Sequence, residues 1–114
     1  MDNGKIRMQQ FNKAMIVEAY TSEEVTLADI DWVLETLHIC SPPPFLVILV
    51  KSGRYSLSSG AKMRLLDDER ISKVAYVSRK LGNTHYAVKA SNTYLQNKEV
   101  FICDSIESAY KALI

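Results

Sequence analysis

The sequence lacks the short motifs by which most catalytic and nucleotide-binding sites are recognised. No Gly-x-Ser-x-Gly, Gly-x-Gly-x-x-Gly or P-loop pattern occurs in its 114 residues. The sequence therefore names no nucleophile paired with a base and no glycine-rich phosphate cradle. We expect a protein that is not an enzyme and that needs no cofactor.

Histidine and cysteine are also scarce. The two histidines, His38 and His85, have no partner at the spacing of a metal site, so we expect no bound metal. The two cysteines, Cys40 and Cys103, lie far apart, each at the end of an apolar stretch. Such cysteines are expected to be buried free thiols rather than a disulfide.

The charge and the hydropathy of the chain are balanced. Its 14 basic and 13 acidic residues give a net charge of +1 and are spread along the chain, which disfavours a nucleic-acid partner. No basic-then-apolar signal peptide occurs, and the longest apolar run, Phe45 to Val50, is too short to cross a bilayer. We therefore expect a cytoplasmic protein without membrane insertion. Its length and its 47% of apolar residues are typical of one globular domain, residues 1–114.

Apolar runs predict the strands of a sheet. Two short β-prone runs on either side of Phe11 to Lys13 predict an antiparallel hairpin. The runs Phe45–Val50, Val74–Val77 and Val100–Ile102 do not alternate with polar residues. They predict central strands that are buried on both faces.

Helices are predicted between these strands and after the last one. Helical spacing or composition marks three segments, residues 26–39, 61–70 and 83–95. Thr26 with Asp29 gives a cap signal, and Asp104 with Glu107 resembles a capping box that opens a final helix. Strands that alternate with helices require a mostly parallel sheet with right-handed crossovers. The predicted fold is an α/β sandwich with a mostly parallel central sheet, an N-terminal antiparallel hairpin and helices that cover the sheet.

Two polar or aromatic features have ordinary structural interpretations. The paired carboxylates of Asp67-Asp68-Glu69 lie in a predicted helix-to-strand loop, where such a cluster is usually a solvated face. Trp32 is expected at the edge of the core. Neither feature predicts a catalytic site.

The stretch from Ser52 to Leu66 follows a predicted buried strand and is rich in serine and glycine. It resembles the signature of the STAS domain, the family of the sporulation anti-sigma-factor antagonist. In that signature a strand is followed by a Ser-Gly turn, and then by Asp-Ser-Ser/Thr-Gly at the start of a helix. The matching residues are Ser52 and Gly53 in the turn and Ser58, Ser59 and Gly60 at the helix. Leu57 stands where the motif has aspartate, and the spacing between the two parts is one residue shorter.

A broader resemblance covers most of the chain. It is to the SpoIIAA-like branch of small bacterial STAS or SEC14-type proteins, which begin with a hairpin. Their C-terminal part resembles the segments KVAYVSRK and EVFICDSIESAYKALI of this chain. The resemblance implies a SpoIIAA-like sandwich and a non-enzymatic regulatory or protein-interaction domain. Its partner would be a regulatory protein that the sequence does not identify; the oligomeric state stays open, with a homodimer as one option.

Ser58 falls on the position that is phosphorylated in the antagonists. The resemblance therefore implies that Ser58 and Ser59 are phosphorylation candidates, and that Ser52, Gly53 and Gly60 belong to a partner-docking loop. Physical chemistry offers another interpretation of the same residues. Either serine is a good helix N-cap, since its hydroxyl accepts a hydrogen bond from a free backbone amide, and Gly60 relaxes the start of the helix. Both interpretations are compatible with the sequence.

A second class of function comes from SEC14-type proteins, which carry apolar ligands between the helices and the sheet. Met63, Tyr86 and Tyr94 lie on predicted helices and are candidates to line such a pocket. A carrier of this kind needs an apolar cavity of roughly 300 Å³ or more. Close packing of a single small core leaves little room for it.

Overall fold

The computed structural model describes residues 1–77 and 87–114 of the chain. Strands and helices alternate as the sequence predicts, and two short strands, β3 and β5, are added in the connections. Residues 87–91 form a short helical segment, while the first part of the predicted helix over 83–95 lies outside the described residues. The labelled elements are β1 (Ile6–Phe11), β2 (Ala14–Ala19), β3 (Glu24–Val25), α1 (Leu27–Cys40), β4 (Val47–Lys51), β5 (Ser56–Leu57), α2 (Ser59–Asp67), β6 (Lys73–Val77), β7 (Glu99–Cys103) and α4 (Ile106–Leu113).

The first two strands form the predicted antiparallel hairpin. They pair until Phe11 lies opposite Ala14, so the turn consists of Asn12 and Lys13. Asn12 has a φ of 53°, in the left-handed region that asparagine adopts more readily than most residues. The hairpin adds an antiparallel edge to the sheet at the predicted place.

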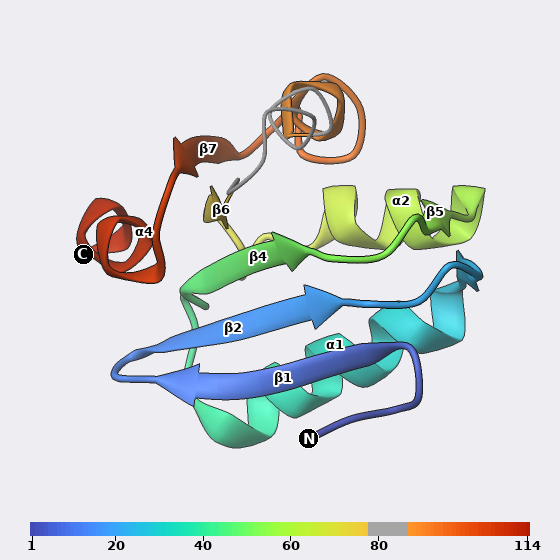
Figure 1. The fold of residues 1–114 in the computed structure, drawn as a ribbon, viewed down its shortest axis with the longest axis horizontal. Helices are drawn as coiled ribbons and strands as arrows, with labels where there is room; N and C mark the ends of the chain where they lie inside the picture. Colours follow the sequence, from blue (N-terminus) through green and yellow to red (C-terminus); the bar gives the residue numbers. More distant parts are fainter. Residues whose placement is uncertain (78–86) are drawn as a thin grey trace.

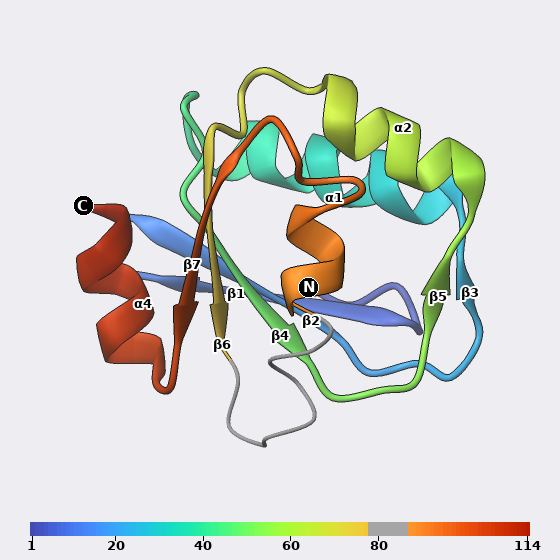
Figure 2. The same cartoon turned by 90° about the horizontal axis from the view of Figure 1, so that it is seen from above.

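The main sheet has five strands in the order β1-β2-β4-β6-β7. The last four of these are parallel, and each new strand is added on the same side of the one before. With right-handed crossovers, this order puts the intervening helices on one face. Figures 1 and 2 show α1, α2 and the helical segment 87–91 on one face and α4 on the other. The predicted α/β sandwich with a mostly parallel sheet is confirmed.

Two apolar clusters lie against the two faces of the sheet. Neighbouring strand residues alternate between them, so that Val47 belongs to the cluster under α1 and α2 and Ile48 to the cluster under α4. β4 and β6 are therefore buried on both faces, which explains their unbroken aliphatic runs. The larger cluster receives a helical stripe from α1, formed by Ile30, Val33, Leu34 and Leu37.

β7 departs from its predicted burial. It is the edge strand of the sheet, and the side chain of Ile102 is 45% exposed. The prediction that Val100–Ile102 is buried on both faces is therefore wrong. The physical reason is that an edge strand has a strand neighbour on one side only, so its side chains pack less completely.

Side-chain caps fix where the helices begin. Thr26 and Asp29 form the capping box predicted for α1, since each accepts a hydrogen bond from the backbone amide of the other. α4 is capped by Ser105, whose hydroxyl accepts from the backbone amide of Ser108 at 3.1 Å. The predicted box of Asp104 and Glu107 is wrong, because the chain enters the helix one residue later.

Candidate functional site

The predicted docking segment, which we call the docking loop, comprises residues 52–60 and runs from the end of β4 into the first turn of α2 (Figure 1). Its start is fastened to the end of β2, because the amides of Ser52 and Gly53 both donate to the carbonyl of Ala19, at 3.2 and 3.1 Å. A Cβ atom added to Gly53 would collide with the backbone of Tyr20 and Thr21. Glycine is therefore required at position 53 for close approach of two backbones.

The middle and the end of the docking loop are also held. β5 pairs in parallel with β3, and the amide of Ser58 donates to the carbonyl of Val25 at 3.0 Å. Ser52 and Ser56 point outward and are exposed, whereas Leu57 is half-buried against the core. The loop is thus a fixed surface with serine side chains on its outer side.

The two candidate serines have different places at the start of α2. Ser58 is the N-cap residue and is half-buried; its hydroxyl accepts a hydrogen bond from the amide of Ala61 at 3.1 Å. Ser59 and Gly60 lie in the first turn and are exposed. A Cβ atom added to Gly60 would meet Leu27 at 3.5 Å, an ordinary contact, so glycine is not required there.

The docking loop and the start of α2 carry only positive charge. No aspartate or glutamate occurs between Lys51 and Leu66, whereas Lys51, Arg54 and Lys62 are basic. Arg64 is also basic, but its charge is balanced by ion pairs with Asp31 (3.3 Å) and Asp68 (3.2 Å). The segment is therefore basic, although the exposed Glu24 of β3 lies opposite Ser56 in the strand pair.

A second pocket, of about 150 Å³, opens beside the docking loop. We call it the tyrosine–lysine pocket. Three tyrosines and three lysines line it, with four other residues. They are Lys51, Tyr55, Ser56, Leu57, Lys62, Tyr76, Lys89, Ala90, Thr93 and Tyr94. This pocket is not predictable from the sequence alone, because its residues come from β4, the docking loop, α2, β6 and the segment after residue 87.

The side chains in the tyrosine–lysine pocket influence one another. Burial raises the pKa of Tyr55 to about 12, against a smaller opposing effect of a hydrogen bond with Tyr76. Burial and the nearby Tyr55 and Tyr76 raise the pKa of Tyr94 as well. The ammonium of Lys51 lies 3.8 Å from the centre of the Tyr55 ring, and burial lowers the pKa of Lys51. The pocket thus combines neutral hydroxyl groups with a partly desolvated cation.

An apolar cavity lies deeper, between the sheet and the helices α1 and α2, as expected for a carrier. Its volume, about 60 Å³, is far below the roughly 300 Å³ that a ligand pocket needs. Tyr94 lines the cavity as predicted, but Met63 is 55% exposed, and Tyr86 lies outside the described residues. The packing leaves room for much less than a lipid.

The paired carboxylates before β6 differ from their predicted solvated state. Asp68 is only 4% exposed, and its carboxylate accepts hydrogen bonds from Arg70 at 2.7 and 3.0 Å. The interpretation as a solvated face is therefore wrong for Asp68, although Asp67 and Glu69 are exposed. Arg70 in turn stacks on the ring of Phe45, which shows that the cluster fastens the loop to the core.

The remaining sequence predictions concern groups outside these pockets. Cys40 and Cys103 are free thiols, as predicted, but they are half-buried rather than buried. Trp32 is half-buried against the core, as predicted. Within residues 1–77 and 87–114, no three His, Cys, Asp or Glu side chains are grouped to hold a metal ion. The same residues contain no helix with the length and apolar character to cross a membrane. His38 is exposed near the end of α1, and His85 lies outside the described residues.

Comparison with known proteins bears on the fold. No protein-family model and no curated protein matches the chain. The chain is similar to the crystal structure of an uncharacterized protein from the DUF3478 family of Shewanella loihica, described as having a SpoIIAA-like fold. The TM-score is 0.59 at 15% sequence identity, and the match covers 96% of this chain and 92% of that chain. A likeness at this identity concerns the fold alone, and the fold agrees with the one that the sequence resemblance implies.

Proposed function

Since the chain has a SpoIIAA-like fold, we propose that residues 1–114 act as one non-enzymatic regulatory domain that binds a partner protein through the docking loop. The observation that carries this proposal is the form of the loop. It is fixed to β2 and β3 by backbone hydrogen bonds, yet it exposes Ser52, Arg54 and Ser59 to solvent. A fixed, exposed loop loses little conformational entropy when a partner binds.

Charge indicates what kind of partner surface the loop suits. Lys51, Arg54 and Lys62 give the segment three positive charges, while Glu24 of the paired strand β3 lies opposite Ser56. An acidic surface on the partner protein would be attracted to the loop and would bind faster at low ionic strength. The partner is thus a regulatory protein with an acidic docking surface.

Phosphorylation at Ser58 would act on the same charges. Its hydroxyl lies at the N-terminus of α2, where backbone amides favour negative charge. A phosphate there adds about 1.5 to 2 negative charges and largely offsets the basic residues of the loop. We infer that a phosphate on Ser58 weakens binding of an acidic partner, as a switch would.

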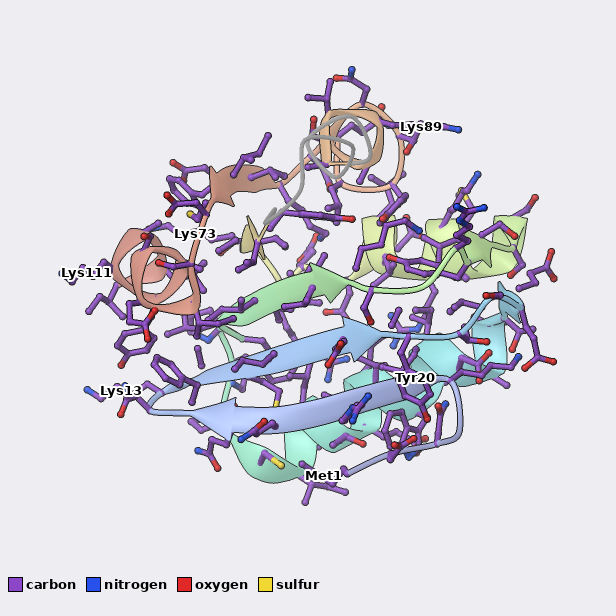
Figure 3. The ribbon with its side chains drawn as sticks, viewed as in Figure 1. Met1, Lys13, Tyr20, Lys73, Lys89 and Lys111 are labelled. Atoms are coloured by element: carbon purple, nitrogen blue, oxygen red, sulfur yellow. The ribbon has the colours of Figure 1, made fainter. Side chains whose placement is uncertain are left out.

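The proposal is tested by affinity capture from the native cell with matched charge variants. Arg54→Glu reverses a charge in the docking loop, whereas Lys13→Glu makes the same change at the hairpin turn, at the far end of the sheet (Figure 3). A partner captured by the wild type and by Lys13→Glu, and lost by Arg54→Glu, supports the docking loop. Equal capture by all three proteins would overturn it. Mass spectrometry of the captured domain also reports whether Ser58 carries phosphate.

The second candidate function, carriage of a small apolar ligand, rests on the apolar cavity between the helices and the sheet. At about 60 Å³ this cavity would have to enlarge severalfold to hold a lipid. Organic extraction of gently purified protein, followed by mass spectrometry, tests it. A lipid recovered in a molar amount close to that of the protein would favour carriage over the docking proposal.

A further inference from the structure

The tyrosine–lysine pocket lies where ligands bind in open α/β sheets. Lys51 ends β4, and Tyr76 lies next to the end of the parallel neighbour β6. Figure 2 shows the arrowheads of both strands at the same edge of the sheet. In such sheets, ligands occupy the crevice beyond the carboxyl ends of the strands.

Strand register brings the two residues to one face. Leu49 pairs with Tyr76, and Lys51 is two residues beyond Leu49, so all three side chains point to the face that α1 and α2 cover. Tyr55 and Tyr94 pack against the apolar cluster of that face. The pocket is therefore a continuation of the interior that opens to solvent.

The walls of the pocket are cationic and carry no carboxylate. Lys51, Lys62 and Lys89 line it, and none of the ten lining residues is acidic. Within the described residues, the side chains of Lys62 and Lys89 form no ion pair; Lys89 extends outward from its helical segment (Figure 3). Three lysines without a lining carboxylate give the pocket a positive potential, which favours an anion.

Hydroxyl donors complete the pocket. Tyr55, Tyr76 and Tyr94 converge on it, and Tyr55 and Tyr76 are hydrogen-bonded to each other. The hydroxyl of Tyr55 is protonated at neutral pH, since its pKa lies near 12, and that of Tyr94 is protonated for the same reason. Protonated phenols donate hydrogen bonds to anionic oxygens.

From the three lysines, the tyrosine hydroxyls and the absence of acidic residues among the lining side chains, we infer that the tyrosine–lysine pocket binds a small phosphate-bearing molecule. Three cationic side chains match a dianionic phosphate better than a monoanionic carboxylate. The volume of about 150 Å³ is half the lower limit for drug-sized ligands, so the molecule is small. Tyr55, Leu57 and Tyr94 offer apolar surface to the rest of it.

Isothermal titration calorimetry with three defined probes tests the inference. Inorganic phosphate and phenyl phosphate should both bind to the wild type, and benzoate should bind at least about tenfold more weakly because it carries one charge. Tighter binding of phenyl phosphate than of inorganic phosphate would identify a phosphate ester as the ligand, and equal binding would identify free phosphate. Benzoate that binds as well as phosphate would overturn the assignment to phosphate, and so would failure of both phosphates to bind at millimolar concentration.

Variants locate the binding in the pocket. Lys62→Gln and Lys51→Gln should each weaken phosphate binding about tenfold. Lys111→Gln, on α4 at the opposite face of the sheet, should not change it (Figure 3). Lys62 is exposed, so its variant keeps the test valid even if the Lys51 variant does not fold. Equal weakening by all three variants would indicate non-specific attraction and overturn the site. This ligand needs no partner protein, so its test is independent of the docking proposal.

Discussion

The hydroxyl of Ser58 accepts a hydrogen bond from the backbone amide of Ala61, at 3.1 Å, and thereby caps α2. The same hydroxyl is the one that the sequence resemblance marks for phosphorylation. Capping and modification therefore compete for one oxygen atom. The two roles differ in what a substitution does to the stability of the domain.

Ser58→Ala should lower the free energy of unfolding by about 1 kcal/mol, because the first turn of α2 loses its cap. Ser58→Asp should be neutral or slightly stabilising, since aspartate caps well and interacts favourably with the helix dipole. Ser59→Ala is the matched control, because Ser59 is exposed and does not cap the helix. Urea denaturation measures all three. An equal loss in Ser59→Ala would show that the cap is shared or misassigned.

The two glycines of the docking loop should respond in opposite ways to alanine. Gly53→Ala should cost about 1–3 kcal/mol, since its Cβ would collide with the backbone of Tyr20 and Thr21. Gly60→Ala should be neutral or stabilise the protein by about 0.4–1 kcal/mol, because the site has room and alanine restricts the unfolded chain. Thermal melts of the two variants compare them directly. A tolerated Gly53→Ala would mean that the loop is not fixed against β2.

The fold could be predicted from the sequence to the extent that apolar runs report burial. β4 and β6 are buried on both faces, so their residues are aliphatic without interruption. β3 and β5 were not predicted, because strands of two residues are too short for any periodicity to show. The apolar run of β7 likewise does not reveal that β7 is an edge strand, since the order of strands depends on contacts between distant segments.

The candidate site could be predicted only where it is local in sequence. The start of α2 follows from Ser58 and its neighbours, because capping involves residues three apart. The tyrosine–lysine pocket was missed because Tyr55, Tyr76 and Tyr94 meet only after the sheet has formed. Lysine and tyrosine at the ends of two predicted parallel strands, Lys51 and Tyr76, were the one available signal. The burial of Asp68 was missed for a similar reason, since its carboxylate pairs with Arg64 and Arg70 and its carbonyl accepts a hydrogen bond from the distant Lys98.

Asp68→Asn should lower the free energy of unfolding at neutral pH by about 3 kcal/mol. The substitution removes a buried carboxylate that binds both Arg64 and Arg70. Asp67→Asn is the matched control, because Asp67 is the exposed neighbour, and its effect should be small. Equal effects of the two substitutions in urea denaturation would contradict the structural role of Asp68.

The stabilisation by Asp68 should also depend on pH. Hydrogen bonds from Arg70 hold the pKa of Asp68 below its ordinary value of 3.8. A lowered pKa in the folded state means that the stabilisation is present above about pH 4 and is lost as the pH falls through the folded pKa. The difference in stability between wild type and Asp68→Asn should therefore shrink below about pH 4. A difference that stays constant down to about pH 2 would show that Asp68 does not stabilise the protein through its charge.

The buried hydroxyl of Tyr55 should make the stability of the protein fall as the pH rises in the alkaline range. Burial raises its pKa to about 12, whereas tyrosine in the unfolded chain ionises near pH 10. Between these values the unfolded state has released a proton that the folded state still holds, so rising pH favours unfolding. Tyr55→Phe removes this contribution, and its stability should fall less steeply than that of the wild type between about pH 10 and pH 12.

Phenolate absorbance of the folded wild type gives a second measurement, because the Tyr55→Phe difference spectrum should show little ionisation below about pH 11. A full phenolate signal from Tyr55 near pH 10 in folded protein would show that its hydroxyl is in free contact with water, and the tyrosine–lysine pocket would then lack a buried donor.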